Sequence, residues 1–290
     1  MRNIVLTLEY DGSLFHGWQS QLNAATVQDA VAAAVGKLDG TPRRVTGASR
    51  TDAGVHAKAQ VANFFTDSNI PADKYAYALN TILPAGVACV RSFEADSGFH
   101  ARFSAINKAY SYLILNRRLP SALYRYRAWH VPLPLDITAM REAARLFIGE
   151  HDFKAFMSTG SPVNSTVRTI TRLELGAYPA SVYDPLSAVS PLNLLSAASP
   201  PPATCSAEPL SAASPPPASL QEPEAFIILL IEGNGFLYNM VRIITGTLVY
   251  VGQGRLSIGD AGRALASGDR KSAGKTAPPH GLYLEYVNYV

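Results

Sequence analysis

The run Arg50-Thr51-Asp52-Ala53-Gly54-Val55 is the part of the sequence best suited to chemistry. It places one carboxylate between an arginine and a glycine turn, and a carboxylate beside a permanent cation stays ionised. That charge state is the one that a nucleophile or a charge stabiliser needs. Thr-Asp-Ala-Gly is also typical of a plain hairpin turn, because Asp bonds its own backbone and Gly tolerates positive φ. Local spacing alone favours the turn, so neighbouring residues must decide whether Asp52 is catalytic.

Arg242 is a candidate partner for Asp52. It lies in an otherwise apolar helical run, directly before Ile243 and Ile244. An unpaired charge is costly to bury, so an arginine in this position should meet a carboxylate. The preceding stretch, 233–238, superficially resembles a phosphate loop but has neither the GxGxxG nor the GxxxxGKS/T spacing. A nucleotide-phosphate loop is therefore excluded, and Asp52 is the economical partner.

Aromatic and cationic residues alternate in two further stretches. Residues 99–112 contain His100, Arg102 and Lys108 among phenylalanines and tyrosines, and 117–129 interleaves four arginines with aromatics. Rings beside cations can stack nucleobases and hold phosphates. Alternating tyrosines are also common on ordinary strands, but the composition of 117–129 is that of a loop, and loops are poor places for core packing. We therefore expect the 117–129 loop to meet an RNA backbone.

Other reaction chemistries find little support in the sequence. No two acids are spaced as a glycosidase couple, no serine lies in a nucleophile elbow, and the six histidines form neither HxxxH nor HxH. The two cysteines, Cys89 and Cys205, form no CxxC pair. The run His151-Asp152-Phe153 could be a fragment of a metal site, although a helix-terminal turn is the commoner meaning of such a pair. We therefore expect no metal.

Composition limits the class of protein and of partner. The 290 residues include 25 basic and 22 acidic side chains, and five of the acids but none of the bases fall within 173–224. The remainder of the chain therefore has a balance of +8, which suits a polyanion such as nucleic acid. No apolar run approaches the roughly 20 residues that span a bilayer, and the N-terminus enters a strand-like alternation at once. We expect a cytoplasmic protein without membrane association.

The stretch at about 178–224 is unlike the rest of the chain. It is rich in Pro, Ser and Ala, and the nonapeptide Leu-Ser-Ala-Ala-Ser-Pro-Pro-Pro-Ala begins at Leu195 and again at Leu210. Such a composition cannot bury enough apolar surface to offset the entropy of ordering it. We interpret it as a disordered insertion between two strands, with a proline-rich docking segment as the less favoured alternative.

The elements that must position these residues repeat in two halves. In the first half, the patterns predict a strand from Ile4 to Tyr10, a helix after the capping box that begins at Thr26, strands over 44–50 and 59–66, a helix over 72–82 and a strand over 87–94. The second half gives strands over 109–115, 168–175, 225–232 and 282–289, with helices after Asp136 and over 239–250.

This double β-α-β-β-α-β order predicts an α+β fold of two ferredoxin-like halves. We expect a largely antiparallel sheet with helices packed on one side and a central RNA-binding cleft. The expected domains are an N-terminal half, 1–104, with the Asp52 loop, and a C-terminal half, 105–290, interrupted by the insertion.

Six sequence blocks together resemble the TruA class of tRNA pseudouridine synthases. They appear in the family order and span nearly the whole chain outside the insertion: Tyr10-Asp11-Gly12 with Gly17-Trp18-Gln19, Arg50 to Ala57, Ala101-Arg102-Phe103 with Lys108 and Tyr110, Gly149 to Phe153, Gly235 to Arg242, and Gly281-Leu282. The run Arg-Thr-Asp-Ala-Gly-Val-His is highly specific to this class. The insertion departs from the family pattern, since a short connection is expected there.

The resemblance implies a reaction and a set of roles. The enzyme would isomerise uridine to pseudouridine at about nucleotides 38 to 40 of the tRNA anticodon stem-loop, without cofactor, as a homodimer with tRNA lying across both subunits. Asp52 matches the catalytic aspartate, which forms either a covalent adduct or, by proton abstraction, a glycal-type intermediate. Arg242 matches its basic partner, Tyr110 the tyrosine packed against the base, and Arg50 the residue that helps to extrude the base. Further substrate contacts are assigned to Arg102, Lys108, His56 and Leu282.

A second hypothesis is a non-catalytic RNA-binding or tRNA-folding module on the same scaffold. Asp52 would then be a structural turn residue. The presence of Asp52, Tyr110 and Arg242 in one chain favours the enzyme.

Overall fold

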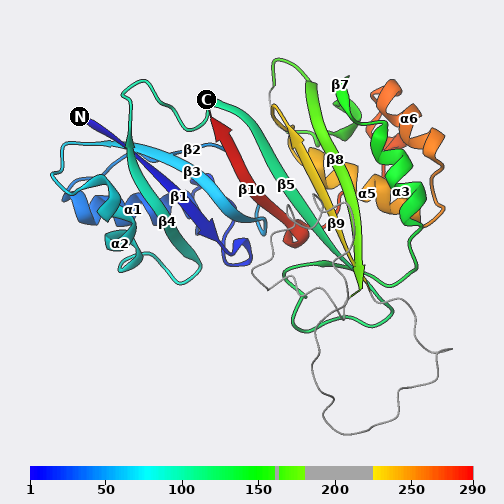
Figure 1. The fold of residues 1–290 in the computed structure, drawn as a ribbon, viewed down its shortest axis with the longest axis horizontal. Helices are drawn as coiled ribbons and strands as arrows, with labels where there is room; N and C mark the ends of the chain where they lie inside the picture. The colour runs from blue at the N-terminus through cyan, green and yellow to red at the C-terminus, as the bar shows by residue number, and fades with distance from the viewer. Residues whose placement is uncertain (161–162, 180–224, 290) are drawn as a thin grey trace, which may run out of the picture.

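A computed structural model describes residues 1–160, 163–179 and 225–289 of the chain. The described residues form one sheet with the strand order β4-β1-β3-β10-β5-β9-β8-β7, and β2 and β6 pair at the sides of this path. Two groups of helices cover the same side of the sheet, α1 and α2 over the N-terminal strands and α3, α5 and α6 over the C-terminal ones (Figure 1). The α+β class, the mostly antiparallel sheet and the one-sided helices predicted from the sequence are confirmed.

The N-terminal half is a ferredoxin-like unit. Its central strand β1 (Arg2–Tyr10) pairs antiparallel with β3 (His56–Thr66) and β4 (Val87–Ala95). The two-residue strand β2 (Thr46–Gly47) lies on the other side of β3, which completes the order β4-β1-β3-β2. Two helices pack on one face, α1 (Val27–Asp39) and α2 (Tyr75–Asn80).

The C-terminal half repeats this topology. Strand β5 (Ala105–Asn116) lies between β10 (Leu282–Tyr289) and β9 (Ala225–Gly233), and β8 (Val167–Pro179) follows β9. Two short strands extend the sheet, β7 (Gly149–Asp152) beside β8 and β6 (Trp129–Val131) beside β5. The helices are α3 (Ile137–Arg145), α5 (Met240–Gly252) and α6 (Ile258–Ser267). The order β10-β5-β9-β8 matches β4-β1-β3-β2, as a duplicated unit requires.

The last strand of the chain joins the two halves. Strand β10 pairs antiparallel with β5 along its length, but it is paired with β3 in parallel only through Tyr283 with His56 and Leu284 with Ala57. Ion pairs across the junction add to this short ladder, Lys58 with Glu285 at 2.9 Å and Arg127 with Asp11 at 3.3 Å. The N-terminal and C-terminal sheets therefore meet at a narrow seam.

Helix starts follow the capping signals in the sequence. Thr26 accepts a hydrogen bond from the Asp29 amide at the start of α1, and Asp136 accepts one from the Ala139 amide at the start of α3. The predicted apolar faces are buried, with Val27, Val31 and Val35 in α1. Helices α1 and α3 therefore begin at their predicted caps, and α1 turns its apolar stripe toward the sheet.

Several predicted elements differ from the structure. The strand expected over 44–50 pairs only at Thr46–Gly47, and the sequence analysis did not predict β7 or α6. Strand β8 continues to Pro179, so residues 178–179, the start of the predicted insertion, belong to a strand. The rest of the predicted insertion lies outside the described residues. None of the helices in the described ranges is long and apolar enough to cross a membrane.

The arginine-aromatic loop before β6 covers the second face of the C-terminal sheet. Leu113, Leu115, Phe226 and Ile228 form a small apolar cluster with Ala128, and Tyr124 packs against it. Part of the loop therefore packs against the sheet, while Arg118, Arg125 and Tyr126 are exposed, so its expected contact with RNA stays a prediction.

Candidate active site

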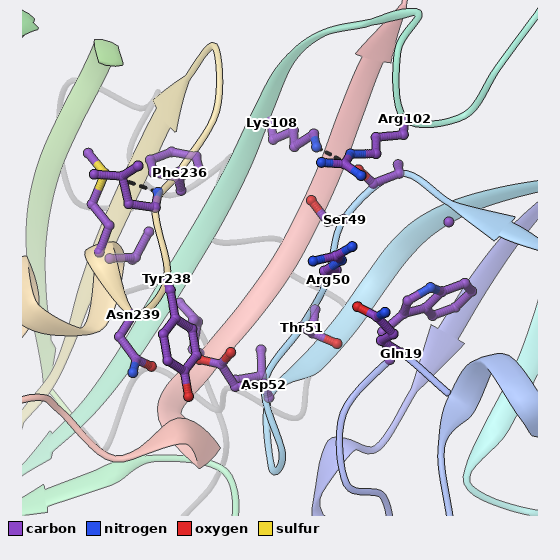
Figure 2. Close-up of a pocket in the computed structure, with 18 of the residues that line it drawn as sticks. Gln19, Ser49, Arg50, Thr51, Asp52, Arg102, Lys108, Phe236, Tyr238 and Asn239 are labelled. Atoms are coloured by element: carbon purple, nitrogen blue, oxygen red, sulfur yellow. Dashed lines mark hydrogen bonds between the residues drawn. The ribbon is translucent and has the colours of Figure 1, made fainter. Parts of the chain in front are cut away.

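A cavity of about 940 Å³ opens between the two halves. Its lining includes six basic side chains, and Asp52 is the one acid among the described residues that line it. Figure 2 shows Arg102 and Lys108 at one end of the site, and Asp52, Tyr238 and Asn239 at the other. The cavity can therefore attract a polyanion while presenting a single carboxylate to it. The basic residues are Arg44, Arg50, Arg102, Lys108, Arg168 and Arg242.

Asp52 begins a tight turn. The Val55 amide donates to the Asp52 carbonyl at 3.1 Å, and Gly54 has a φ of +82° at the third position of the turn. This geometry requires a residue that tolerates positive φ, which explains the glycine. Asp52 is therefore both a turn residue and the candidate catalytic residue.

Residues of the 10–18 segment hold this turn in place. The Trp18 amide donates to the Thr51 carbonyl at 3.0 Å, and the Tyr10 hydroxyl bonds the Thr51 hydroxyl at 2.8 Å. Gly17 passes so close to Thr51 that an added Cβ would lie 2.5 Å from its carbonyl oxygen, and one on Gly12 would lie 1.9 Å from that of Val55. The two glycines let one backbone segment support the other, which fixes the position of Asp52.

Arg242, in the first turn of α5, faces Asp52 across the cavity. Its Nη1 lies 3.1 Å from Asp52 Oδ2, and the two side chains are 15% and 26% exposed respectively. Arg242 also donates from Nη1 to Asn239 Oδ1 at 2.6 Å and from Nε to the Ala277 carbonyl at 2.8 Å. The guanidinium is thus held by three partners, so it can orient the carboxylate. The arrangement brings together the two residues that the sequence analysis paired.

Burial and Arg242 act on Asp52 in opposite directions. Removal from water raises the pKa of the carboxyl above its ordinary value, and the charge and hydrogen bond of Arg242 lower it. The net direction is upward, because burial is the larger effect. The sequence shows the neighbouring cation but not the burial, so the upward direction of this pKa is an effect of tertiary structure.

Tyr110, on β5, forms an aromatic wall of the cavity with Phe236. Their ring centroids lie 5.3 Å apart with the planes nearly perpendicular, and Tyr110 is buried. Burial raises the pKa of the Tyr110 phenol to about 12, with the Asp52 charge acting in the same direction. Leu282, at the start of β10, adds an apolar side chain to the same lining. These groups offer a planar ligand a neutral surface beside the Asp52–Arg242 pair.

Lys108 and Arg102 supply positive charge at the other end. Lys108 Nζ donates to the Ala48 carbonyl at 2.6 Å, and thereby ties β5 to the segment that leads to Asp52. Burial, aided by the Arg102 charge, lowers the pKa of Lys108 to about 8. Arg102 and Arg50 are exposed residues in the cavity lining. Seven of the eight predicted site residues therefore lie in this lining.

His56 is the exception, because it does not line the cavity. Its buried ring accepts a hydrogen bond from the Gly12 amide at Nδ1, and Nε2 donates to the Tyr126 carbonyl at 2.8 Å. The ring also stacks on Tyr283 at 4.7 Å. Burial lowers the pKa of His56, which agrees with a neutral ring. The predicted substrate contact of His56 is thus not supported, since its side chain packs into the seam between the halves.

The structure adds residues that the sequence analysis did not single out. Asn239 adopts a φ of +62° and bonds Arg242, and Tyr238, Arg44 and Arg168 join the lining. Asn239 could have been found, since it precedes Arg242 by three residues and asparagine tolerates positive φ. Arg44 and Arg168 carry no local signal, because only the fold brings them to the cavity. No described group of three or more His, Cys, Asp or Glu could hold a metal ion.

Comparison with known proteins supports the resemblance noted in the sequence. The family model for tRNA pseudouridine synthase matches residues 7–104 and 143–290. Relatives named tRNA pseudouridine synthase A from Thermoanaerobacter sp. (strain X514) and Acetivibrio thermocellus are each 43% identical to the chain, and one from Ruminiclostridium cellulolyticum is 45% identical. Each alignment covers 289 residues and 100% of both chains. The chain therefore belongs to the tRNA pseudouridine synthase family.

Proposed function

We propose that this protein isomerises uridine to pseudouridine in tRNA. The observation that carries the proposal is the pairing of Asp52 with Arg242 in a cavity where every other charged residue among the described lining is a cation. The cations suit an RNA backbone, and the carboxylate suits the positive character that develops at C1′ when a glycosidic bond breaks. Membership of the family points to the same reaction.

The reaction rearranges bonds within one nucleotide. Asp52 attacks C1′ as the N1–C1′ bond breaks, the uracil turns in the site, and C5 then bonds to C1′ with release of the aspartate. C5 loses its proton and N1 gains one, so the atoms of the nucleotide are conserved. No oxidant, reductant or energy source is consumed, because substrate and product are isomers. A base in a stem must first leave the stack, at a cost of a few kcal/mol. The cavity offers the flipped base a site next to Asp52.

The remaining roles follow from position. Arg242 orients Asp52, Tyr110 packs against the uracil as it turns, and Leu282 contacts the same base. Arg50 helps to extrude the base, because it is an exposed cation beside Asp52 in the sequence. Arg102 and Lys108 bind the backbone of the substrate at the far end of the cavity.

We further propose the setting in which the enzyme works. The substrate is the anticodon stem-loop, at about nucleotides 38 to 40, as the motif resemblance implies. The enzyme acts as a homodimer in the cytoplasm, with residues 1–104 and 105–290 as its two domains. The duplicated strand order supports that division, since each half is one β-α-β-β-α-β unit.

An unmodified tRNA transcript tests the reaction. Incubation with the protein should convert anticodon-arm uridines to pseudouridine, detected as carbodiimide-dependent stops in primer extension. Asp52→Asn should bind the transcript and yield no stops. A non-catalytic RNA-binding module would instead bind the transcript without product even as the wild-type protein, and that result would overturn the proposal.

A further inference from the structure

A second hollow, of about 560 Å³, adjoins the catalytic cavity. The two share Arg44, Thr46 and Arg102 in their linings, so one surface continues into the other. Phe65, His100 and Phe103 belong only to the second hollow. None of the catalytic roles described above uses these three side chains.

Phe103 is a large apolar side chain left open to solvent. It is 75% exposed, yet the turn that carries it is firmly anchored. The buried Ala101 amide donates to Asn63 Oδ1 at 3.0 Å, and the Ala101 carbonyl accepts from the Tyr289 hydroxyl at 2.7 Å. His100 Nδ1 accepts from the Phe103 amide at 3.3 Å. The ring is therefore presented in a preorganised position, which reduces the entropy lost when a ligand stacks on it.

One guanidinium and one imidazole ring lie against Phe103. The Arg102 guanidinium lies 5.4 Å from the Phe103 ring centroid, and the His100 ring centroid lies 4.4 Å away with the two planes tilted by 31°. Arg43 is neutralised by the buried Asp39 at 3.0 Å, but Arg44 and Arg102 are exposed and have no carboxylate partner among the described residues. An aromatic face flanked by unpaired arginines is the arrangement that binds unstacked nucleotides, the ring taking the base and the arginines the phosphate.

We propose that this second hollow binds an unpaired nucleotide of the substrate RNA that flanks the reacting uridine. The base stacks on Phe103, and its phosphate lies between Arg44 and Arg102, the residues shared with the catalytic cavity. The proposal rests on the proposed function, because it requires RNA in that cavity. The unpaired arginines and the continuous lining favour RNA over a protein segment. Stacking outside the cavity would also offset part of the free energy needed to flip the target base.

Binding of anticodon stem-loop RNAs to the full-length protein tests the subsite. Single abasic sites are placed at each loop position, and Kd is measured for wild type, Phe103→Ala and Phe103→Trp. One abasic position should weaken binding to wild type by about 5- to 100-fold, the range expected for loss of one stacked base. Phe103→Ala should bind intact RNA as weakly as wild type binds the RNA with that abasic site, and its Kd should be the same for both RNAs. Phe103→Trp should again bind intact RNA more tightly than the abasic RNA.

Two matched variants control for nonspecific effects. Tyr77→Ala removes a 73% exposed aromatic that lines neither cavity, and Arg145→Gln removes an exposed charge from α3. Arg44→Gln should reduce the slope of log Kd against log salt by about 0.7, and Arg145→Gln should leave it unchanged. The subsite is overturned if Phe103→Ala behaves as Tyr77→Ala does, or if abasic sites affect it and wild type equally. Absence of pseudouridine with the wild-type protein would instead overturn the proposed function.

Discussion

At the scale of single residues, Asp52 combines a buried position with a required charge. Burial raises its pKa, and Arg242 partly reverses that effect while holding the carboxylate from 3.1 Å. Groups held against their solvation preference are typical of catalytic sites, where they gain reactivity toward a developing positive charge. Arg242 thus orients the carboxylate and opposes the rise in its pKa that burial causes.

The pH dependence of the chemical step should report this balance. Protonated Asp52 cannot attack C1′, so the single-turnover rate should fall as pH falls through its pKa. Arg242 lowers that pKa, so Arg242→Gln should shift the acidic limb to higher pH, as well as reduce the rate at its plateau. Single-turnover rates measured between about pH 4 and pH 8 would show the shift. Arg145→Gln should keep the wild-type limb, and a limb that stays in place in Arg242→Gln would contradict the role assigned to the pair.

The roles of individual residues can be predicted from the sequence where the residue type is unusual for its surroundings. Arg242 in an apolar helix and Asp52 beside a glycine turn were paired correctly on that basis. His56 was assigned to substrate through its place in a motif, but neighbours from three distant segments bury it in the seam. Tertiary contacts of this kind leave no local signal, and the same reason explains why Arg168 was missed.

At the scale of elements, the Asp52 turn depends on the 10–18 segment beneath it. The turn pairs with no strand, since β2 ends at Gly47 and β3 begins at His56. Its backbone is held instead by the Trp18 amide and by the close approach of Gly12 and Gly17, and Tyr10 bonds the side chain of Thr51. Alternation of residue types over 44–50 predicted a longer strand because an extended segment packed in this way has the same pattern as a paired one.

Alanine at Gly17 should therefore damage the site more than alanine at another positive-φ glycine. Gly17 has a φ of +88° and an added Cβ would lie 2.5 Å from the Thr51 carbonyl, whereas Gly40 has a φ of +71° and open space around it. We expect Gly40→Ala to lower the free energy of unfolding by about 1 kcal/mol through backbone strain alone. Gly17→Ala should lower it by about 2 to 4 kcal/mol, because steric overlap is added.

Urea unfolding and single-turnover rates would separate the two effects. Gly17→Ala should have a reduced single-turnover rate even without urea, where the variant is still folded, because the Asp52 turn is displaced. Gly40→Ala should keep the wild-type rate. Equal losses of activity in the two variants would show that the 10–18 segment does not position Asp52.

At the scale of the whole molecule, two ferredoxin-like halves meet at one seam. The β3–β10 ladder has two residue pairs, so side-chain contacts supply much of the connection between the two halves. His56 bonds Gly12 in its own half and Tyr126 in the other, and the nearby charged groups are Asp11 and Arg127, with His280 close by. The duplication and the sheet were predictable from the repeated order of elements, but the seam was not, because its contacts join residues 70 or more positions apart.

The buried His56 predicts a loss of stability in acid. Burial lowers its pKa, so the unfolded chain binds a proton at the ordinary value of about 6.5 while the folded protein resists it. This stabilisation is present above about pH 6.5 and declines as pH falls below it, by at most about 1.4 kcal/mol per pH unit. The free energy of unfolding of wild type should thus decrease between about pH 6.5 and pH 5.

Replacement of the ring should remove that dependence. In denaturant titrations of His56→Gln, the free energy of unfolding should change less across the same pH range. Its value above about pH 6.5 should also be lower than that of wild type, because the packing on Tyr283 is lost. His16→Gln, at an exposed position, should retain the wild-type slope. A wild-type slope in His56→Gln would mean that other groups, such as His280 or Asp11, cause the acid sensitivity.

Release of tritium from C5 of uridine tests the catalytic role of Asp52 most directly, since C5 must lose its hydrogen when it bonds to C1′. A tRNA transcript labelled at that position is incubated with wild-type protein or with Asp52→Asn, at concentrations where filter binding shows that both hold the RNA. Wild-type protein should release tritium, and Asp52→Asn should release none above background. Release at the wild-type rate by the Asn variant would contradict the assignment of Asp52 as the nucleophile.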